Sequence, residues 1–250
     1  MIELLGLQIT EKCNRNCLHC CGSYGPITKK GKEMPLSIAK DYIYQLPEYE
    51  VQKVTISGGE PTLYRDLDEI IISLDESREQ TGYPKEISMV TNSSWAKSFK
   101  PSINKICEWG SLGLDNLSLS YDNFRIEDDK ISARGLAGFY NRICRKRKNF
   151  WPKIELQTVN EVVPLGRARK LPNKTWRVRY NSKELFPCSI DGWARWSFKE
   201  YVKSKGENIE IDDGIKKAVL ISPEGLYLCD CATNVIKMGD YREPLDVVEP

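Results

Sequence analysis

The sequence predicts an α/β fold in which a parallel sheet is connected by crossover helices. Strand-like and helix-like runs alternate through the first two thirds of the chain, which is the pattern of successive β-α-β units. No internal repeat or low-complexity linker interrupts this alternation. At 250 residues, the chain is long enough for one sizeable core and a small appended module.

The expected elements follow one another in a regular order. The strands are expected at residues 4–10, 51–57, 86–92, 116–120 and 154–159, with a further candidate at 176–180. The helices are expected at residues 35–46, 67–81, 102–109 and 128–148. The last third of the chain does not continue this alternation of strands and helices.

The composition is that of a globular protein in a reducing compartment. Hydrophobic residues make up 40% and charged residues 29% of the chain, which excludes a disordered chain. No apolar run approaches the roughly 20 residues of a membrane span, and the first residues lack the basic-then-apolar form of a secretory signal. Nine cysteines without a targeting segment predict a cytoplasmic protein whose thiols bind metal, with no membrane partner.

Charge is unevenly spread, although the net charge is only +2. Residues 140–182 carry an excess of Lys and Arg, whereas residues 207–250 carry an excess of Asp and Glu. The basic run at 142–148 either contacts phosphate or an acidic peptide, or is the solvated end of a helix, where positive charge suits the helix dipole. We favour the second interpretation. Because base-reading motifs are absent, nucleic acid is not an expected partner.

Three closely spaced cysteines follow the first predicted strand. Residues 13–20 read CNRNCLHC, so Cys13, Cys17 and Cys20 are separated by three and two residues. Three thiolates on so short a loop are soft, anionic ligands that can converge on one iron–sulfur cluster. A cubane has four irons, so three protein ligands leave one iron open to an exogenous ligand. A catalytic cluster needs this arrangement and an electron carrier avoids it.

Two other interpretations of these cysteines remain. A zinc knuckle would use Cys17 and Cys20 together with His19 or Cys21, but a structural zinc site takes four ligands, usually as two spaced pairs. No other cysteine pair in the chain has the two-residue spacing. Structural disulfides are disfavoured because neighbouring cysteines bridge poorly.

A second motif ends the second predicted strand. Residues 58–61 read GGEP, and a predicted helix follows. Two glycines at the end of a strand let the backbone approach a ligand closely, and we expect them to leave N–H groups pointing outward. Glu60 would then accept a hydrogen bond from the ammonium group of a ligand. Taken alone, however, this sequence is only a turn.

Together and in this order, the two motifs resemble those of the radical S-adenosylmethionine (SAM) superfamily. The resemblance implies a partial (β/α)6 TIM-like barrel whose site lies at the carboxyl ends of the strands. It also implies that the three cysteines of residues 13–20 hold a [4Fe–4S] cluster whose fourth iron binds the amino and carboxylate groups of SAM. By the same resemblance His19 takes the aromatic position beside the adenine, and the residues that meet the methionyl amine are Gly58, Gly59 and Glu60.

Further SAM contacts are expected where the third and fourth strands end. In the superfamily these strand ends help to hold the ribose and carboxylate of SAM, which makes Asn92, Ser118 and Ser120 binding candidates. Ser118 and Ser120 share one face by the alternation of a strand. Asn and Ser also commonly end strands and begin turns, which is the alternative interpretation. Arg167 lies in a Gly-Arg-Ala segment like one in peptide-modifying relatives, and is either another SAM contact or a surface arginine.

The last third of the chain predicts a small β-hairpin extension. Residues 218–231 read as a hairpin about a Pro-Glu-Gly turn, and this hairpin carries Cys229 and Cys231. Together with Cys188, it resembles the SPASM or shorter twitch extensions, which carry auxiliary iron–sulfur clusters. The glycine-to-cysteine spacing is one residue shorter than usual there. The three cysteines are therefore either ligands of a second cluster or buried thiols.

The resemblance divides the chain into a radical SAM partial barrel at 1–182 and a twitch-like extension at 183–250. Cys107 and Cys144 fall in predicted helices and are expected in the core. No catalytic residue is assigned beyond the cluster. Candidates for a second hydrogen donor are Cys188, Cys229 and Tyr121.

The predicted function is that of a radical SAM enzyme. The resemblance implies that the reduced cluster cleaves SAM to a 5′-deoxyadenosyl radical, which abstracts hydrogen from a substrate. We expect the substrate to be a peptide or protein side chain, because the tail is twitch-like and the Gly-Arg-Ala segment is present. A nucleoside or small metabolite is the alternative. A zinc-stabilised binding module without catalysis is an alternative of another class, although a zinc scaffold has no need of the Gly-Gly-Glu-Pro motif.

Two protein partners are expected. The chemistry requires a reducing partner such as flavodoxin or ferredoxin. No winged-helix recognition domain precedes the first strand, so peptide recognition would fall to a separate protein.

Overall fold

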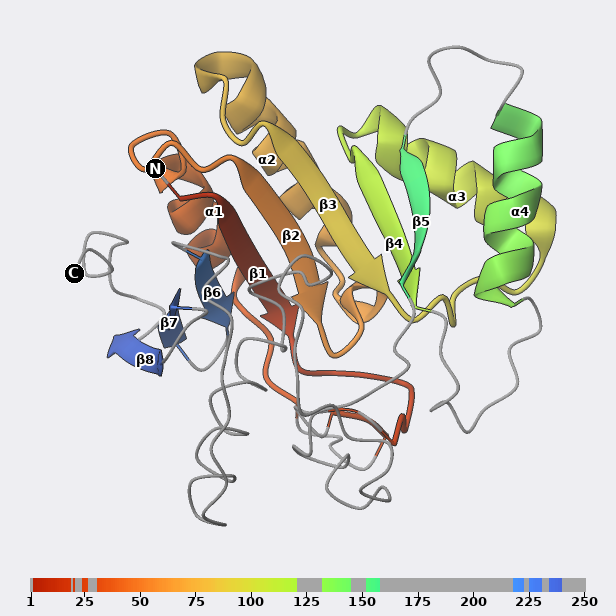
Figure 1. Ribbon diagram of the computed structural model, residues 1–250, viewed down its shortest axis with the longest axis horizontal. Coiled ribbons are helices and arrows are strands. Elements are labelled where there is room, and N and C mark those ends of the chain that lie inside the picture. The colour runs from red at the N-terminus through yellow and green to blue at the C-terminus, as the bar shows by residue number, and fades with distance from the viewer. Residues whose placement is uncertain are drawn as a thin grey trace, which may run out of the picture.

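The computed structural model describes residues 2–18, 20, 24–26, 31–120, 132–144, 152–157, 218–222, 225–230 and 234–239. Its centre is an eight-stranded sheet with the order β5-β4-β3-β2-β1-β6-β7-β8 (Figure 1). The strands are β1 Leu4–Thr10, β2 Lys53–Gly58, β3 Glu86–Thr91, β4 Asn116–Ser120, β5 Lys153–Gln157, β6 Ala218–Ser222, β7 Gly225–Asp230 and β8 Asn234–Gly239. The helices are α1 Leu36–Gln45, α2 Leu67–Thr81, α3 Phe99–Ser111 and α4 Ala133–Cys144, with a short 3-10 turn η1 Pro61–Leu63.

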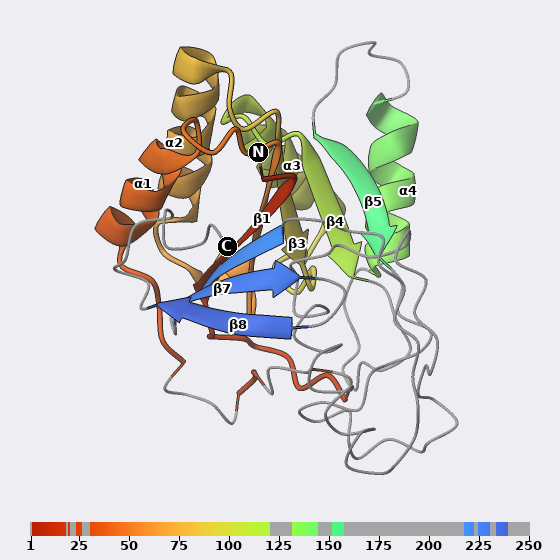
Figure 2. The same cartoon turned by 60° about the vertical axis from the view of Figure 1, so that its left-hand side comes forward.

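Strands β1 to β5 form a parallel sheet in chain order. Helices α1 to α4 all lie on one face of this sheet (Figure 1 and Figure 2). The prediction of an α/β fold with crossover helices is therefore confirmed. The predicted helix at 102–109 is too short because Pro101 looks like a stop signal. In the structure Pro101 lies in the first turn of α3, where its missing N–H needs no partner.

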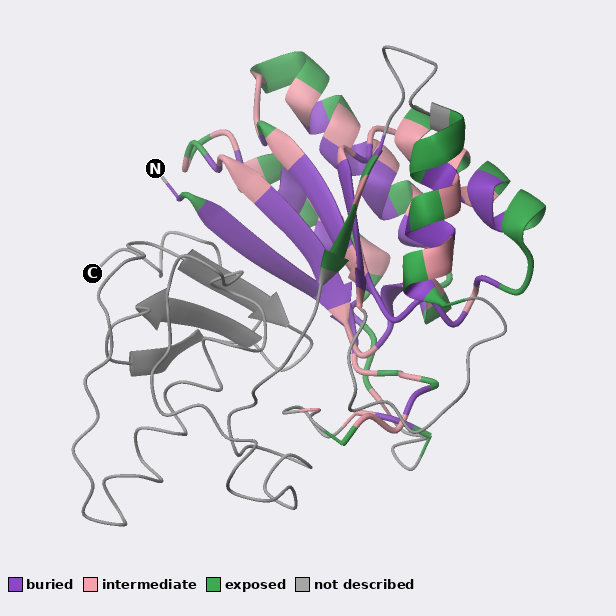
Figure 3. Cartoon of the chain, turned by 45° about the vertical axis from the view of Figure 1, so that its right-hand side comes forward, coloured by how far each residue is buried: buried purple, intermediate pink, exposed green. Residues whose placement is uncertain are grey.

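The two faces of the parallel sheet differ in polarity. Alternate strand residues such as Leu5, Ile56 and Leu117 are buried in the core beneath the helices. Strands β1 to β4 are mostly buried along their length (Figure 3). The face away from the helices is polar, because the residues between the core positions include Gln8, Thr55, Ser88, Asn116 and Ser118, all of them buried. This buried polar face extends to the carboxyl ends of the strands.

The C-terminal strands continue the same sheet. Strand β6 pairs with the free edge of β1 in parallel, with Leu4 opposite Ala218 and Leu7 opposite Ile221. Strands β6 and β7 pair antiparallel where the hairpin was expected, with Ser222 opposite Gly225. Strand β8 adds a further antiparallel strand that the sequence did not predict. None of the described helices is long and apolar enough to cross a bilayer.

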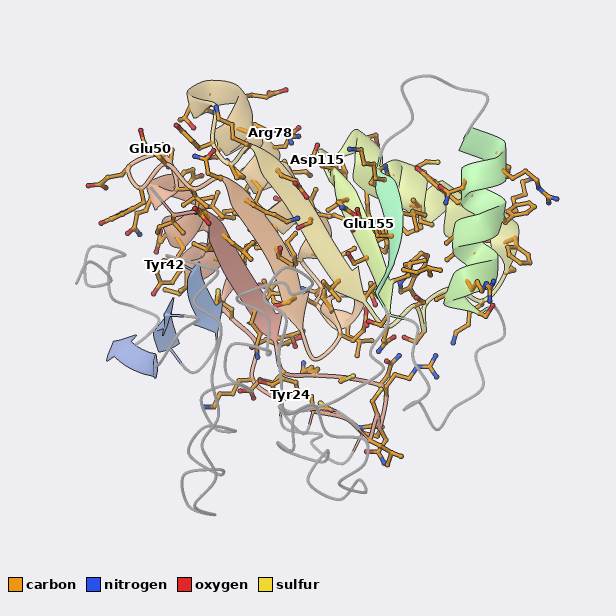
Figure 4. All side chains as sticks on the ribbon, in the orientation of Figure 1. Tyr24, Tyr42, Glu50, Arg78, Asp115 and Glu155 are labelled. Carbon is orange, nitrogen blue, oxygen red and sulfur yellow. The ribbon has the colours of Figure 1, made fainter. Side chains whose placement is uncertain are left out.

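An ion-pair network joins the elements at the amino ends of β3 and β4. Asp115 Oδ2 accepts the N–H of Ile87 at 2.7 Å and the guanidinium of Arg78 at 2.5 Å (Figure 4). Arg78 also pairs with Asp75 and donates to the carbonyl of Gly113 at 3.0 Å. This network fixes the end of α2 to two strand ends.

We expect Asp115→Ala to lower the free energy of unfolding by about 2–3 kcal/mol, because it removes one acceptor of a partly buried guanidinium and the side-chain acceptor of the Ile87 N–H. Urea denaturation of the apoprotein measures the change in the free energy of unfolding. The control is Glu69→Ala, which removes an exposed ion pair to Lys40 and is expected to cost about 0.5 kcal/mol or less. Equal effects of the two substitutions would contradict the role given to Asp115.

Candidate active site

The cysteine-bearing loop begins where β1 ends and is closed by its own backbone. The N–H of Glu11 donates to the carbonyl of Lys32 at 2.8 Å, and the N–H of Lys32 donates to Glu11 Oε2 at 2.8 Å. A Cβ atom on Gly31 would lie 2.8 Å from the carbonyl carbon of Glu11, so only glycine allows this closure. Tyr24, from the same loop, accepts a hydrogen bond from Gln8 Nε2 at 2.8 Å (Figure 4). The loop is thereby anchored to the polar face of β1.

The Gly-Gly-Glu turn packs directly beneath this loop. The N–H of Gly59 donates to the carbonyl of Thr10 at 2.7 Å, and the N–H of Glu60 donates to the carbonyl of Lys12 at 2.8 Å. The expectation that these N–H groups point outward was therefore wrong: they hold the start of the cysteine loop. A Cβ on Gly58 would lie 2.5 Å from the Thr10 carbonyl oxygen, so the glycines serve the contact between the two motifs.

Glu60 is fully buried and its carboxylate joins the ends of β2 and β3. Oε1 accepts hydrogen bonds from the hydroxyls of Thr62 and Thr91, both at 2.6 Å, and from the N–H of Thr62 at 3.3 Å. Oε2 accepts the N–H of Asn92 at 2.7 Å. Burial raises the pKa of Glu60 above its ordinary value, while these four donors oppose that rise. The sequence analysis missed Thr62 and Thr91. For Thr62, a hydroxyl two residues after Glu60 was a local signal, whereas Thr91 lies 31 positions away and had none.

Asn92 links this carboxylate to the cysteine loop. Its Nδ2 donates to Cys13 Sγ at 3.7 Å and to Asn14 Oδ1 at 3.0 Å. Asn14 Nδ2 in turn donates to Ser94 Oγ at 2.7 Å. Asn92 was expected to contact SAM, whereas these bonds of its side chain go to the loop. Asn14 and Ser94 were not singled out from the sequence.

The structure describes all three cysteines of the loop. Cys13, Cys17 and Cys20 are half-buried, and none of them forms a disulfide. Burial raises the pKa of Cys13 most, with smaller contributions from the charges of Glu60 and Cys20. Within the described residues, no group of three His, Cys, Asp or Glu side chains is gathered closely enough to hold one metal ion.

The other predicted site residues are only partly described. Ser118 is buried and Ser120 is half-buried at the end of β4, with Ser118 opposite Val90 of β3. Cys107 packs against the core in α3, as expected. Cys229 lies on β7 opposite Ala218. The residues His19, Cys21, Tyr121, Arg167, Cys188 and Cys231 lie outside the described part of the chain.

Comparison with protein families and curated proteins finds clear similarity. The family model described as the Radical SAM superfamily matches residues 7–166. The molybdenum cofactor biosynthesis protein moc-5 of Caenorhabditis elegans is 26% identical over 170 residues, which is 64% of this chain and 26% of that protein. A probable GTP 3′,8-cyclase of Methanococcus aeolicus is 31% identical over 121 residues, which is 48% of this chain and 38% of that protein. The matches thus span well under half of the curated relatives.

Solved structures share the fold. BtrN in complex with AdoMet and 2-DOIA superposes with a TM-score of 0.54 at 14% identity, covering 96% of this chain and 78% of that one. Streptococcus suis SuiB bound to S-adenosylmethionine superposes with a TM-score of 0.52 at 14% identity, covering 99% of this chain and 65% of that one. At this identity, the likeness concerns the fold alone.

Proposed function

The chain belongs to the radical SAM superfamily, whose members use a [4Fe–4S] cluster and SAM, and from this premise we propose that it is an enzyme that abstracts hydrogen from an organic substrate. The observation that carries the proposal is the contact between two motifs: the loop of Cys13, Cys17 and Cys20 rests on the Gly-Gly-Glu turn at the carboxyl ends of β1 and β2. A zinc-binding module would have no reason to build this contact.

When bound, the cluster and SAM would supply the chemistry, a one-electron cleavage of a sulfonium C–S bond that leads to removal of a hydrogen atom from the substrate. The residues of this chain hold and orient these groups. We propose Cys13, Cys17 and Cys20 as the cluster ligands. Glu60 Oε2 accepts one described hydrogen bond, so it keeps acceptor capacity for the ammonium group of SAM.

The remaining SAM contacts, the reducing partner and the domain division predicted from the sequence are kept as proposals. Ser118, Ser120 and Arg167 remain proposed SAM contacts, as does His19 beside the adenine. A reducing partner such as flavodoxin or ferredoxin would deliver the electron. We also keep the division into a barrel at 1–182 and a twitch-like extension at 183–250, in which Cys188, Cys229 and Cys231 are candidate ligands of a second cluster.

For the substrate we propose a small polar molecule of the nucleotide class, which was the alternative to a peptide. Sequence relatives at 31–33% identity are probable GTP 3′,8-cyclases, whereas a solved structure with a bound peptide, anSMEcpe with AdoMet and Cp18Cys peptide, is similar in fold at only 14% identity. The polar face of the sheet, with Gln8 and Ser118, also suits a substrate rich in hydrogen-bonding groups. A peptide side chain stays the second candidate, favoured by the β6–β7 hairpin that brings Cys229 into the sheet.

The test of radical SAM function uses anaerobically reconstituted protein. We expect about four irons per chain, or about eight if the tail holds a second cluster. With SAM and dithionite, the protein should release methionine and 5′-deoxyadenosine, measured by liquid chromatography and mass spectrometry. A protein that binds iron but never cleaves SAM would contradict the proposal.

The substrate class is tested in the same assay with uniformly deuterated GTP. Transfer of deuterium into 5′-deoxyadenosine would support a nucleotide substrate. Cleavage of SAM without deuterium transfer would remove GTP as the substrate and leave the radical function intact. Peptide substrates would then be tested next.

A further inference from the structure

Asn92 lies where the ends of three strands meet. It directly follows β3, its N–H donates to Glu60 Oε2 at 2.7 Å, and its side chain reaches Cys13 Sγ of the loop after β1. Its exposed fraction is 9%, so its polar groups depend on protein partners. Asn92 is therefore a direct bridge between the Gly-Gly-Glu turn and a proposed cluster ligand.

The hydrogen-bonding pattern fixes the orientation of the Asn92 amide. Its Oδ1 accepts the N–H of Ser94 at 2.9 Å, which requires the oxygen to face that way. Its two Nδ2 hydrogens then face Asn14 Oδ1 at 3.0 Å and Cys13 Sγ at 3.7 Å. A flipped amide would place its oxygen against Asn14 Oδ1 and its amino group against the N–H of Ser94, and both contacts would be repulsive.

Asn14 also fixes the orientation of the Asn92 amide. Its Nδ2 donates to Ser94 Oγ at 2.7 Å, so its Oδ1 is left to accept from Asn92. The result is a closed ring of hydrogen bonds among Asn14, Asn92 and Ser94, in which the backbone N–H of Ser94 completes the ring. It presents one N–H group to the sulfur of Cys13.

We propose that Asn92 is a positioning residue for the cluster: its side-chain N–H fixes Cys13 Sγ and raises the reduction potential of the cluster. The inference rests on the proposed function, because it concerns the cluster that Cys13 would help to hold. A donor to a ligand sulfur stabilises the state with more negative charge, which is the cluster that has gained one electron. Asn92 would thus ease the electron transfer from the reductant on which SAM cleavage depends.

The test compares the midpoint potentials of reconstituted native protein, Asn92→Ala and Asn92→Asp, measured by redox titration with dithionite and electron paramagnetic resonance. Asn92→Ala removes the side-chain donor but keeps the backbone N–H that Glu60 accepts. We expect the equilibrium constant for reduction to fall about tenfold, which is about 59 mV for one electron. Asn92→Asp keeps the shape and the acceptor for Ser94 but puts a negative oxygen toward Cys13, so its potential should fall further.

The matched control is Asn116→Ala, a buried Asn-to-Ala change at the opposite end of the neighbouring strand β4, which should leave the potential unchanged. An unchanged potential in folded Asn92→Ala would overturn the proposal. If Asn92→Ala does not fold, the midpoint potential of Asn92→Asp is the test, and an unchanged potential in that variant would equally overturn the proposal. Failure of the native protein to bind a cluster would instead count against the proposed function, so the two failures are distinguishable.

Discussion

Cys17→Ala protein, reconstituted without oxygen, is expected to lose the cluster of the loop and to release no 5′-deoxyadenosine above background. Cys17 is the middle ligand of the proposed three, and a cubane held by two thiolates has two open irons and is readily lost. Iron should fall by about four per chain, whether or not a second cluster is present in the tail. Iron and sulfide assays, together with the SAM cleavage assay, measure both effects.

Cys107→Ala is the matched control for this prediction. Cys107 is half-buried like Cys17, but it packs against the core in α3 and belongs to neither motif. It should keep its iron and its ability to cleave SAM. If Cys17→Ala kept its full iron content and still cleaved SAM, Cys17 would not be a ligand of the cluster.

Glu60→Ala is expected to have the second largest effect, because it leaves four side-chain and backbone donors without an acceptor in a fully buried position. These donors are the hydroxyls of Thr62 and Thr91 and the N–H groups of Thr62 and Asn92. We expect a loss of about 3 kcal/mol or more in the free energy of unfolding. Glu60→Gln can keep the bonds to Oε1 but places an amino group against the N–H of Asn92, so it should cost about 1–2 kcal/mol.

The penalty for Glu60→Gln should also depend on pH. Because burial raises the pKa of Glu60 in the folded protein, the native residue contributes most stability below the ordinary glutamate pKa and loses it as the pH rises through the raised value. Glutamine does not titrate. The difference between the two proteins in urea denaturation should therefore be larger at about pH 4 than at about pH 7. A larger difference at the higher pH would show that the carboxylate is held in its charged form.

The helices and the first five strands could be predicted because their signals are local. Helix α2 was predicted with its observed limits, 67–81, and the structure shows that it ends at Gly82 in the left-handed conformation typical of helix ends. The cysteine and Gly-Gly-Glu motifs were recognised because both are contiguous in the sequence. Their mutual contact could not be predicted, since it depends on backbone groups of Thr10 and Lys12 that carry no sequence signal.

Contacts between residues far apart in the chain could not be predicted from the sequence for the same reason. Nothing in the residues around Asn92 indicates that its amide reaches Cys13, 79 positions earlier. Likewise, the hairpin of β6 and β7 was predicted from its turn, but its docking against β1 was not. Pairing between segments so far apart is decided by which edge is left open once the other strands are in place.

The position of β6 has a consequence for how the chain is made. Strand β1 emerges from the ribosome before strands β2 to β8, yet its second neighbour begins only at Ala218. At about 5–20 residues per second, the edge of β1 waits about 10–40 s for its partner during synthesis. For that time the backbone that leads into the cysteine loop is an open edge, to which a strand of another chain can pair. Slow translation or crowding of nascent chains should therefore lower the yield of native protein before any cofactor is inserted.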